Sequence, residues 1–411
     1  MILKTEFMTF LSKCAIAVLA AGGAVACSQA PKTTSIIDEN VAVAKQQLSM
    51  LADSSEMTGT IRIPSTYKNG RIDYVPTDDW VSGFFAGNLW YMYELTGDEA
   101  WAERARKHTE ILDSIQYLQW HHDVGFMIYD SYGNGLRLKN IPEYRDVIVQ
   151  TAKSLSTRFR EVPGVIQSWD ADRGWQGERG WQCPVIIDNM MNLELMFKAT
   201  EISGDSTFYN IAVKHADRTM QEHFRDDYSC YHVVDYDLTD GHVRGRCTAQ
   251  GYADDSAWAR GQAWAVYGYT TCYRYTGDKR YLDHAEKVAG FMLNDKNMPE
   301  DLVPYWDYDA PNIPDEPRDA STAAILASAF YEMYTYTNNE LYREKADRMI
   351  ESLSSPAYRA PVGENGGFLL MHSVGSIPHG SNIDVPLNYA DYYFLEALIR
   401  KGHIEKGEPL F

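Results

Sequence analysis

The feature of this sequence that most restricts its fold is a two-helix unit that occurs four times. Each copy has an apolar, aromatic-rich segment, a short polar turn and a more charged amphipathic segment. The four turns are Thr96-Gly97-Asp98, Ser203-Gly204-Asp205, Thr276-Gly277-Asp278 and Thr337-Asn338-Asn339. Glycine favours the left-handed conformation that ends a helix, and the aspartate after it is a preferred N-cap for the next one. The repeat therefore predicts an array of helical hairpins.

The polarity of each pair predicts how the helices are layered. The first helix is apolar on most faces and must be buried, whereas the second has one charged face and lies outside. Inner helices surrounded by outer helices form an α/α barrel. Further helices are expected at 40–54, 142–160 and 386–400, which brings the total near six hairpins. Strand patterns are confined to short stretches such as Cys230-Tyr-His-Val-Val234.

The first 26 residues predict export. A short apolar run follows Lys13 and is too short to cross a bilayer as a helix. It ends in Ala24-Val25-Ala26-Cys27, which resembles a lipoprotein box and predicts a lipid on Cys27. Ordinary secretory cleavage after Ala26 is the alternative. A polar tether at 27–37 and one catalytic domain at 38–411 follow, in a membrane-anchored protein that faces the periplasm or, otherwise, a soluble periplasmic one.

The charge restricts the partners of the protein. Its net charge is −19, from 38 basic and 57 acidic residues, and it becomes −20 when residues 1–26, with two Lys and one Glu, are removed. Nucleic acid and anionic membrane surfaces are therefore excluded as partners, and a membrane would be reached only through the lipid anchor. An anionic substrate would need a few local Arg and His side chains to attract it.

The cysteines and aromatic residues are less decisive. Cys183, Cys230, Cys247 and Cys272 form no CxxC motif, which argues against a zinc site. A Cys230–Cys247 disulfide and four buried free thiols are both compatible with the sequence. Ten Trp and 28 Tyr are typical of carbohydrate-active proteins, although an aromatic-rich helical core would also account for them.

Polar clusters occur where the inner helices begin, and the loops before these helices should meet at one mouth. The clusters are Asp78-Asp79-Trp80, His121-His122-Asp123, Asp188 and the segment Gln250–Trp264. Each has a structural explanation, since Asp188 suits an N-cap, Asp123 suits a turn and the two histidines suit a surface. Trp258 and Trp264, however, offer flat faces for sugar rings, and Arg260 offers paired donors for a carboxylate. Together the clusters favour a site for an acidic sugar.

Several strings resemble those of the unsaturated glucuronyl hydrolases, family 88 of the glycoside hydrolases. They are Asp79-Trp80-Val-Ser-Gly-Phe84, His122-Asp123-Val-Gly-Phe126, Ile187-Asp188-Asn-Met-Met-Asn192, the block from Gln250 to Trp264, and Tyr389-Ala-Asp-Tyr-Tyr-Phe394. The resemblance spans roughly residues 40–400 in family order. It implies an all-α (α/α)6 barrel that needs no metal or organic cofactor.

The resemblance also implies roles for individual residues. Asp188 matches the general acid/base and Asp123 the second essential carboxylate. The expected substrate-binding residues are Trp80 and Trp264 for stacking, His122, His232 and Gln250 for sugar contacts, Arg260 for the uronate carboxylate, and Trp258, which is either a contact or structural. The loop Met371–His379 contains serines but no Lys, which leaves sulfate recognition open, with His372 or His379 as possible contributors.

The expected substrate is an oligosaccharide with a Δ4,5-unsaturated uronic acid at its non-reducing end, left by a lyase acting on a glycosaminoglycan. The expected reaction is hydration of the C4=C5 vinyl ether. The alternatives are an unsaturated rhamnogalacturonyl hydrolase acting on pectin fragments, a cell-surface protein that binds acidic sugars without turnover, and another α/α-barrel enzyme such as an epimerase.

Overall fold

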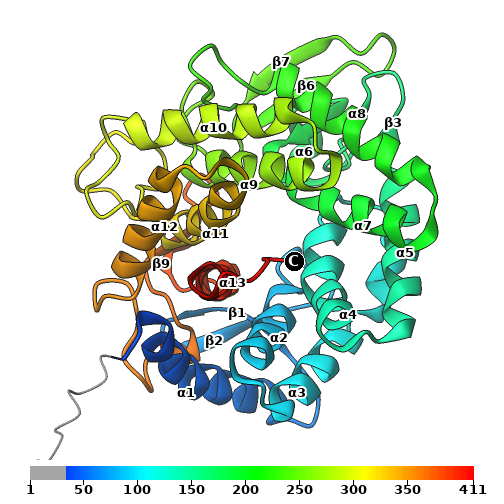
Figure 1. Cartoon of the computed structure of the whole chain (residues 1–411). Helices are drawn as coiled ribbons and strands as arrows, with labels where there is room; N and C mark the ends of the chain where they lie inside the picture. The colour runs from blue at the N-terminus through cyan, green and yellow to red at the C-terminus, as the bar shows by residue number, and fades with distance from the viewer. Residues whose placement is uncertain (1–33) are drawn as a thin grey trace, which may run out of the picture. The chain divides into compact units, whose positions relative to one another are not determined.

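The structure, a computed structural model, describes residues 34–411, and Ile36–Phe411 form one compact unit (Figure 1). The expected export signal and Cys27 lie outside the described residues. The helices are α1 Ile36–Glu56, α2 Phe84–Thr96, α3 Glu99–Glu110, α4 Asn134–Lys139, α5 Pro142–Ser156, α6 Gly174–Glu178, α7 Leu193–Ser203, α8 Ser206–Glu222, α9 Ala259–Thr276, α10 Lys279–Asn294, α11 Ala320–Thr337, α12 Glu340–Leu353 and α13 Asn388–Lys406. Shorter helical turns are η1 Asp113–Tyr117, the π-helical η2 Gly125–Gly133, η3 Ile187–Asn192 and η4 Asn365–Gly367.

Six inner segments of this unit form a ring. In order around it, α2, η2 with α4, α7, α9, α11 and α13 each pack on the next, and α13 packs back on α2. The outer helices that follow the first five are α3, α5, α8, α10 and α12 (Figure 1). The sixth pair consists of α13 and α1, so it joins the two ends of the unit. α1 lies outside and packs on α2. The predicted (α/α)6 barrel is confirmed, and the helices expected at 40–54, 142–160 and 386–400 are α1, α5 and α13.

The turns of the repeat adopt the predicted caps. Gly97, Gly204 and Gly277 have φ of 66°, 74° and 67°, and Asn338 takes the same left-handed conformation in the fourth copy. The side chains of Asp98, Asp205, Asp278 and Asn339 each accept a backbone N–H of the next helix. These caps set the angle between each inner helix and its outer partner.

Two features go beyond the expectation. The second inner segment, η2 and α4, was not among the expected helices. Nine short strands also occur in the described part: β1 Ile63–Lys68, β2 Arg71–Val75, β3 Phe159–Arg160, β4 Val165–Ile166, β5 Cys183–Ile186, β6 Val233–Tyr236, β7 Val243–Cys247, β8 Ser373–Ser376 and β9 Ser381–Val385. They pair antiparallel as β1-β2, β3-β4, β5-β6-β7 and β8-β9. They occur in the segments between helices.

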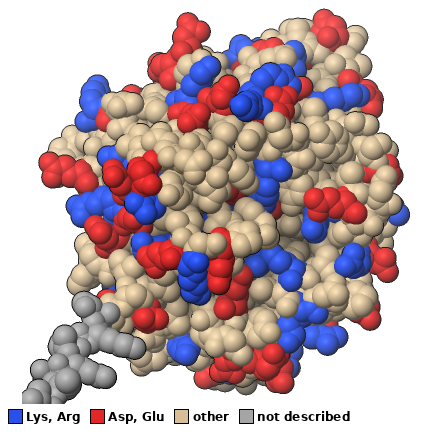
Figure 2. Space-filling model, in the orientation of Figure 1, with Lys and Arg blue, Asp and Glu red and all other residues tan. Residues whose placement is uncertain are grey.

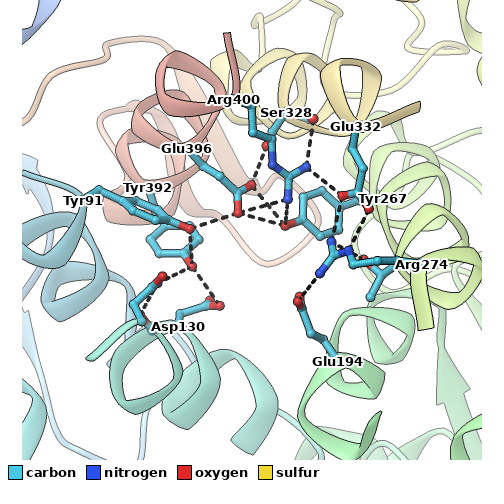
Figure 3. A network of polar contacts seen from close by, with 12 residues as sticks. Tyr91, Asp130, Glu194, Tyr267, Arg274, Ser328, Glu332, Tyr392, Glu396 and Arg400 are labelled. Carbon is cyan, nitrogen blue, oxygen red and sulfur yellow. Dashed lines mark hydrogen bonds and ion pairs between the residues drawn. The ribbon is translucent and has the colours of Figure 1, made fainter. Parts of the chain in front are cut away.

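A network of buried polar side chains ties the inner helices together further along the barrel (Figure 3). Arg274 of α9 pairs with Glu332 of α11 at 2.7 Å and with Glu194 of α7. Arg400 of α13 also reaches Glu332, at 3.0 Å. Glu396 of α13 accepts hydrogen bonds from the hydroxyls of Tyr91, Tyr267 and Ser328. Because the partners come from different inner helices, the network fixes their mutual positions beside a cavity of about 670 Å³.

The remaining sequence expectations concern cysteines and surface. Cys183, Cys230, Cys247 and Cys272 are free thiols, so the Cys230–Cys247 disulfide is not formed. On the face seen in Figure 2, acidic and basic side chains are intermixed and not segregated. Within residues 34–411, no helix combines the length and apolarity needed to span a bilayer.

Candidate active site

The segments at the start of the inner helices bring the two predicted carboxylates together. Asp123 lies just before η2, and Asp188 lies in η3, directly after strand β5. A Cβ on Gly125 would lie 2.3 Å from Oδ1 of Asn192, so the lack of a side chain lets η2 pack against η3. The two carboxyls are close enough for the charge of Asp123 to raise the pKa of Asp188.

Asp123 is held as a carboxylate. Burial by itself raises its pKa, but His122, His121 and Arg158 outweigh burial, and the pKa lies below its ordinary value. Nε2 of His122 is 3.2 Å from Oδ1, and Nδ1 of His121 is 3.2 Å from Oδ2. An imidazole nitrogen thus lies near each oxygen of the side chain, and because its pKa is lowered, Asp123 is ionised at neutral pH.

The environment of Asp188 raises its pKa, whereas that of Asp123 lowers it. The side chain of Asp188 is 11 % exposed, and Oδ2 has no hydrogen-bond partner among the described residues. Burial raises the pKa of Asp188 to about 7; Arg260 lowers it, and the charge of Asp123 raises it. Two neighbouring carboxyls whose pKa values are pushed apart are the usual mark of an acid beside a fixed negative charge. Asp188 can thus carry a proton near neutral pH.

His232, the residue before β6, faces Asp188. Its Nδ1 accepts the backbone N–H groups of Ala249 and Gln250 at 3.0 and 3.1 Å. Burial, followed by Arg260, lowers the pKa of His232 well below its ordinary value, so the ring is neutral. Because Nδ1 accepts, the proton resides on Nε2, which lies 3.7 Å from Oδ2 of Asp188. His232 therefore presents a single N–H donor to the site.

Arg260 is almost fully engaged by protein groups. It lies 1 % exposed in the first turn of α9 and bonds to Asp319 at 3.0 Å and to the carbonyl oxygens of Val374 and Gly375. Asp319 is also the N-cap of α11. Arg260 thus fastens strand β8 over the site, and only its Nε lacks a hydrogen-bond partner in the described part. The predicted contact with a uronate carboxylate would have to add to these bonds.

This chain is similar to known proteins over most of its length. No profile of a known protein family matches it. An unsaturated glucuronyl hydrolase from Formosa agariphila is 49 % identical over 333 residues, covering 80 % of this chain and 82 % of that protein. An unsaturated chondroitin disaccharide hydrolase from Streptococcus pneumoniae is 33 % identical over 345 residues, or 82 % of this chain and 85 % of that protein.

The chain belongs to the unsaturated glucuronyl hydrolase family. The crystal structure of a member specific for heparin superimposes with a TM-score of 0.86 at 43 % identity, covering 90 % of this chain and 98 % of that one. The member from Bacillus sp. GL1, which degrades glycosaminoglycan, gives 0.79 at 30 % identity, with 89 % and 96 % covered. The protein is accordingly a glycoside hydrolase, and the sequence-based family assignment is confirmed.

The tryptophans of this glucuronyl hydrolase do not all lie where they were expected. Trp80 is half-buried and packs against Phe84, Phe126 and Tyr389, so part of its side chain is open to solvent. Trp264 is 0 % exposed, and protein covers both of its faces. The predicted stacking role of Trp264 is therefore corrected, because its position in the inner helix α9 places the ring in the barrel core. Its N–H instead lies beside Asp188 and lowers the pKa of that carboxyl.

Trp258 packs against two residues of the site, His232 and Arg260. It is 3 % exposed, packs against the imidazole of His232 with ring centroids 4.6 Å apart, and lies under the guanidinium of Arg260 at 4.6 Å. Of the two roles left open for it, the structural one fits this burial. Gln250 is partly exposed, and its amide donates to the carbonyl oxygen of Gly375 at 3.3 Å, which links it to strand β8.

Three residues around the pair had no predicted role, and one of them, Trp169, was not among the candidates. Asp79 is a third carboxyl near Asp123; its pKa is raised by burial and also by the charge of Asp123. The backbone of Trp169 pairs with that of His121, which places this indole at the edge of the Asp123 loop. His121 was named only as a surface candidate, yet it is buried. Its adjacency to His122-Asp123 was a usable signal, whereas Trp169 lies in a segment without helical period.

A group of potential metal ligands lies elsewhere in the sequence than the catalytic pair. Within residues 34–411, one group of potential ligands comes together: Asp237, Asp240 and His242, whose ligand atoms lie within 4.8 Å of one another. These residues form the β6–β7 turn, where Asp237 and Asp240 already accept the backbone N–H groups of Thr239 and His242. The turn itself accounts for this cluster, and the side chains around Asp188 do not form such a group in the described part.

Proposed function

We propose that this glucuronyl hydrolase removes a Δ4,5-unsaturated uronic acid from the non-reducing end of a lyase-generated oligosaccharide derived from a glycosaminoglycan. The observation that carries the proposal is the unequal carboxyl pair. Asp188 has a pKa raised to about 7, and Asp123 beside it is ionised. The names of the relatives support the substrate class, because they include a chondroitin disaccharide hydrolase and a member specific for heparin.

The chemistry requires an acid that can protonate carbon. Protonated Asp188 gives its proton to C4 of the C4=C5 bond, and the positive charge that develops at C5 is shared with the ring oxygen. Asp188, now a carboxylate, takes a proton from a water molecule that adds to C5, which restores the acid. The resulting hemiketal opens, and the hemiacetal left at C1 collapses to release the rest of the sugar. One water molecule is consumed, and no other reactant is needed.

The neighbouring side chains suit this sequence of steps. The carboxylate of Asp123 stabilises the positive charge at C5 and adds to the effect of burial, which raises the pKa of Asp188. The Nε2–H of neutral His232 is a fixed donor to a sugar oxygen, and the partly exposed ring of Trp80 offers a face to the sugar. Arg260 supports the site by holding β8 in place, and its charge favours an anionic substrate.

The test follows the ultraviolet absorbance of the C4=C5 bond. Purified protein, starting at residue 28, is incubated with unsaturated disaccharides from chondroitin, heparin, hyaluronan and pectin lyase digests. We expect the absorbance to be lost with glycosaminoglycan products for the wild type and not for Asp188→Asn. Loss with pectic products alone would assign the rhamnogalacturonyl activity, and tight binding without loss would assign a binding protein.

Export and anchoring are a separate proposal that rests on the sequence. Cys27 follows Ala24-Val25-Ala26 in a lipoprotein-like box, and we propose that it carries a lipid that anchors the protein facing the periplasm. Incorporation of labelled palmitate into the wild-type protein, and its loss in Cys27→Ser, would support this. Cleavage after Ala26 without label would leave the soluble periplasmic form.

A further inference from the structure

Three indoles gather beside the catalytic pair. The ring centroids of Trp169 and Trp175 lie 5.0 Å apart, and Trp181 lies 5.9 Å from each of them. All three are partly exposed and pack on Ile186, Val233 and Ala249. These apolar residues are within two positions of Asp188, His232 and Gln250, respectively. The three rings, called here the tryptophan wall, therefore lie next to the catalytic site.

The wall is fixed to the site at several points. Trp169 lies 6.2 Å from the ring of His232, and its backbone pairs with His121. The preceding residue, Ser168, accepts the backbone N–H of His122 and donates its own to the carbonyl oxygen of Pro184. The wall is thus held between the loop that carries Asp123 and the strand that leads to Asp188.

A second segment meets the wall from the opposite side. His379, in the turn between β8 and β9, has its ring centroid 5.0 Å from that of Trp175. Nδ1 of His379 lies 2.8 Å from Oγ of Ser376, on the strand that Arg260 holds by its carbonyl groups. His379 and Trp175 therefore face each other beside the site.

Arg179 supplies an uncommitted positive charge at this position. Its guanidinium lies 5.5 Å from the ring centroid of Trp181 and 6.0 Å from that of Trp175. The guanidinium forms no ion pair or hydrogen bond with the described residues, whereas those of Arg158 and Arg173 both pair with Asp170. Arg179 also contributes, after burial, to lowering the pKa of His379, so the two side chains share one environment. An exposed arginine without a carboxylate partner is a ready receptor for an anion.

We propose that the tryptophan wall binds the sugar that follows the unsaturated uronate, and that Arg179 selects a sulfate group on that sugar. This inference rests on the proposed function and adds its specificity. Indole faces stack on the apolar faces of sugar rings, and a weakly hydrated guanidinium suits the delocalised charge of a sulfate. The loop Met371–His379 contains no Lys, so Arg179 is a basic group placed for this role from a different segment.

The test compares unsaturated disaccharides that differ only in sulfation, each assayed by loss of C4=C5 absorbance. For Arg179→Gln we expect the ratio of kcat/KM on the sulfated to that on the unsulfated substrate to fall about 3- to 10-fold, as for a partly exposed charge-assisted contact. Arg179→Lys should retain part of the preference. Trp175→Ala should raise KM for both substrates, and Trp175→Phe should restore most of the binding.

The matched control is Arg173→Gln, an exposed arginine of the same segment that is already paired with Asp170. It should leave the ratio unchanged. The preference of the wild type should also shrink as salt is added, because the contact is exposed. Hydrolysis with the same ratio in wild type and Arg179→Gln would overturn the inference and leave the proposed function standing. Failure of the wild type on every disaccharide would overturn both.

Discussion

Replacing Asp188 by Asn should make the protein more stable at neutral pH while abolishing catalysis. The reason is that the site holds a carboxyl where ionisation is unfavourable. Burial raises the pKa of Asp188 from 3.8 to about 7. Since one pKa unit corresponds to about 1.4 kcal/mol, the difference between 3.8 and 7 amounts to about 4 kcal/mol of unfolding free energy.

The pH dependence of this gain follows from the sign of the shift. Below about pH 4 the carboxyl is protonated in both folded and unfolded chains, so its titration gives the wild type no disadvantage. Between about pH 4 and 7 only the unfolded chain ionises, and the wild type loses about 1.4 kcal/mol per pH unit relative to Asp188→Asn. Above pH 7 both states are ionised, and the difference stays constant.

Denaturant unfolding of both proteins at several pH values between 4.5 and 8.5 measures this difference. Asp123→Asn is the matched control, because its carboxyl has the opposite shift. The pKa of Asp123 is lowered, so its charge contributes stability above its unfolded pKa, and that contribution is lost as pH falls. The control should therefore be less stable than wild type at pH 8. A stability difference between Asp188→Asn and wild type that is independent of pH would refute the argument.

Three further predictions concern charges around the same pair and in the barrel. Asp123→Asn should shift the alkaline limb of the kcat/KM profile, set by Asp188 at about pH 7, to lower pH, because it removes a charge that raises that pKa. Arg260→Gln should shift the limb to higher pH, because it removes a charge that lowers the pKa; residual activity measured across pH tests both. Arg400→Met should destabilise the protein by about 3–5 kcal/mol, since Glu332 and Glu396 lose a buried partner, while KM stays unchanged. Denaturant unfolding and steady-state kinetics on one preparation separate these effects, and a raised KM would contradict the last prediction.

The fold could be predicted because its signals are local. Gly97 and Asp98 specify one turn between helices, and the same pair of signals recurs in the later copies. The second inner segment escaped notice because its π-helical turns do not follow the 3.6-residue period on which the prediction relied. Apart from the stretch 230–234, which overlaps β6, the strands escaped because several have only two to four residues, too few for an alternating pattern.

The site could be predicted in part. Asp123 and Asp188 were found because both begin inner segments, and the resemblance gave their roles. Whether a side chain of an inner helix is buried, however, depends on which side of that helix faces the barrel axis. Trp264 was for that reason assigned an open face that it does not have. Trp175 and Trp181 lie outside the repeat, although three tryptophans spaced six residues apart in 169–181 were a compositional signal.

The acidic charge of the protein does not oppose an anionic substrate, because the charges that matter are those beside the site. At physiological ionic strength, exposed charges more than about 8 Å away are largely screened. The face in Figure 2 mixes acidic and basic side chains. Beside the site, by contrast, Arg260 is buried and Arg179 is unpaired among the described residues. The one carboxyl that must approach the reacting carbon, Asp188, is protonated at the pH where it acts. The net charge of −19 and binding of a uronate are thus compatible, because the site supplies its own local positive charge.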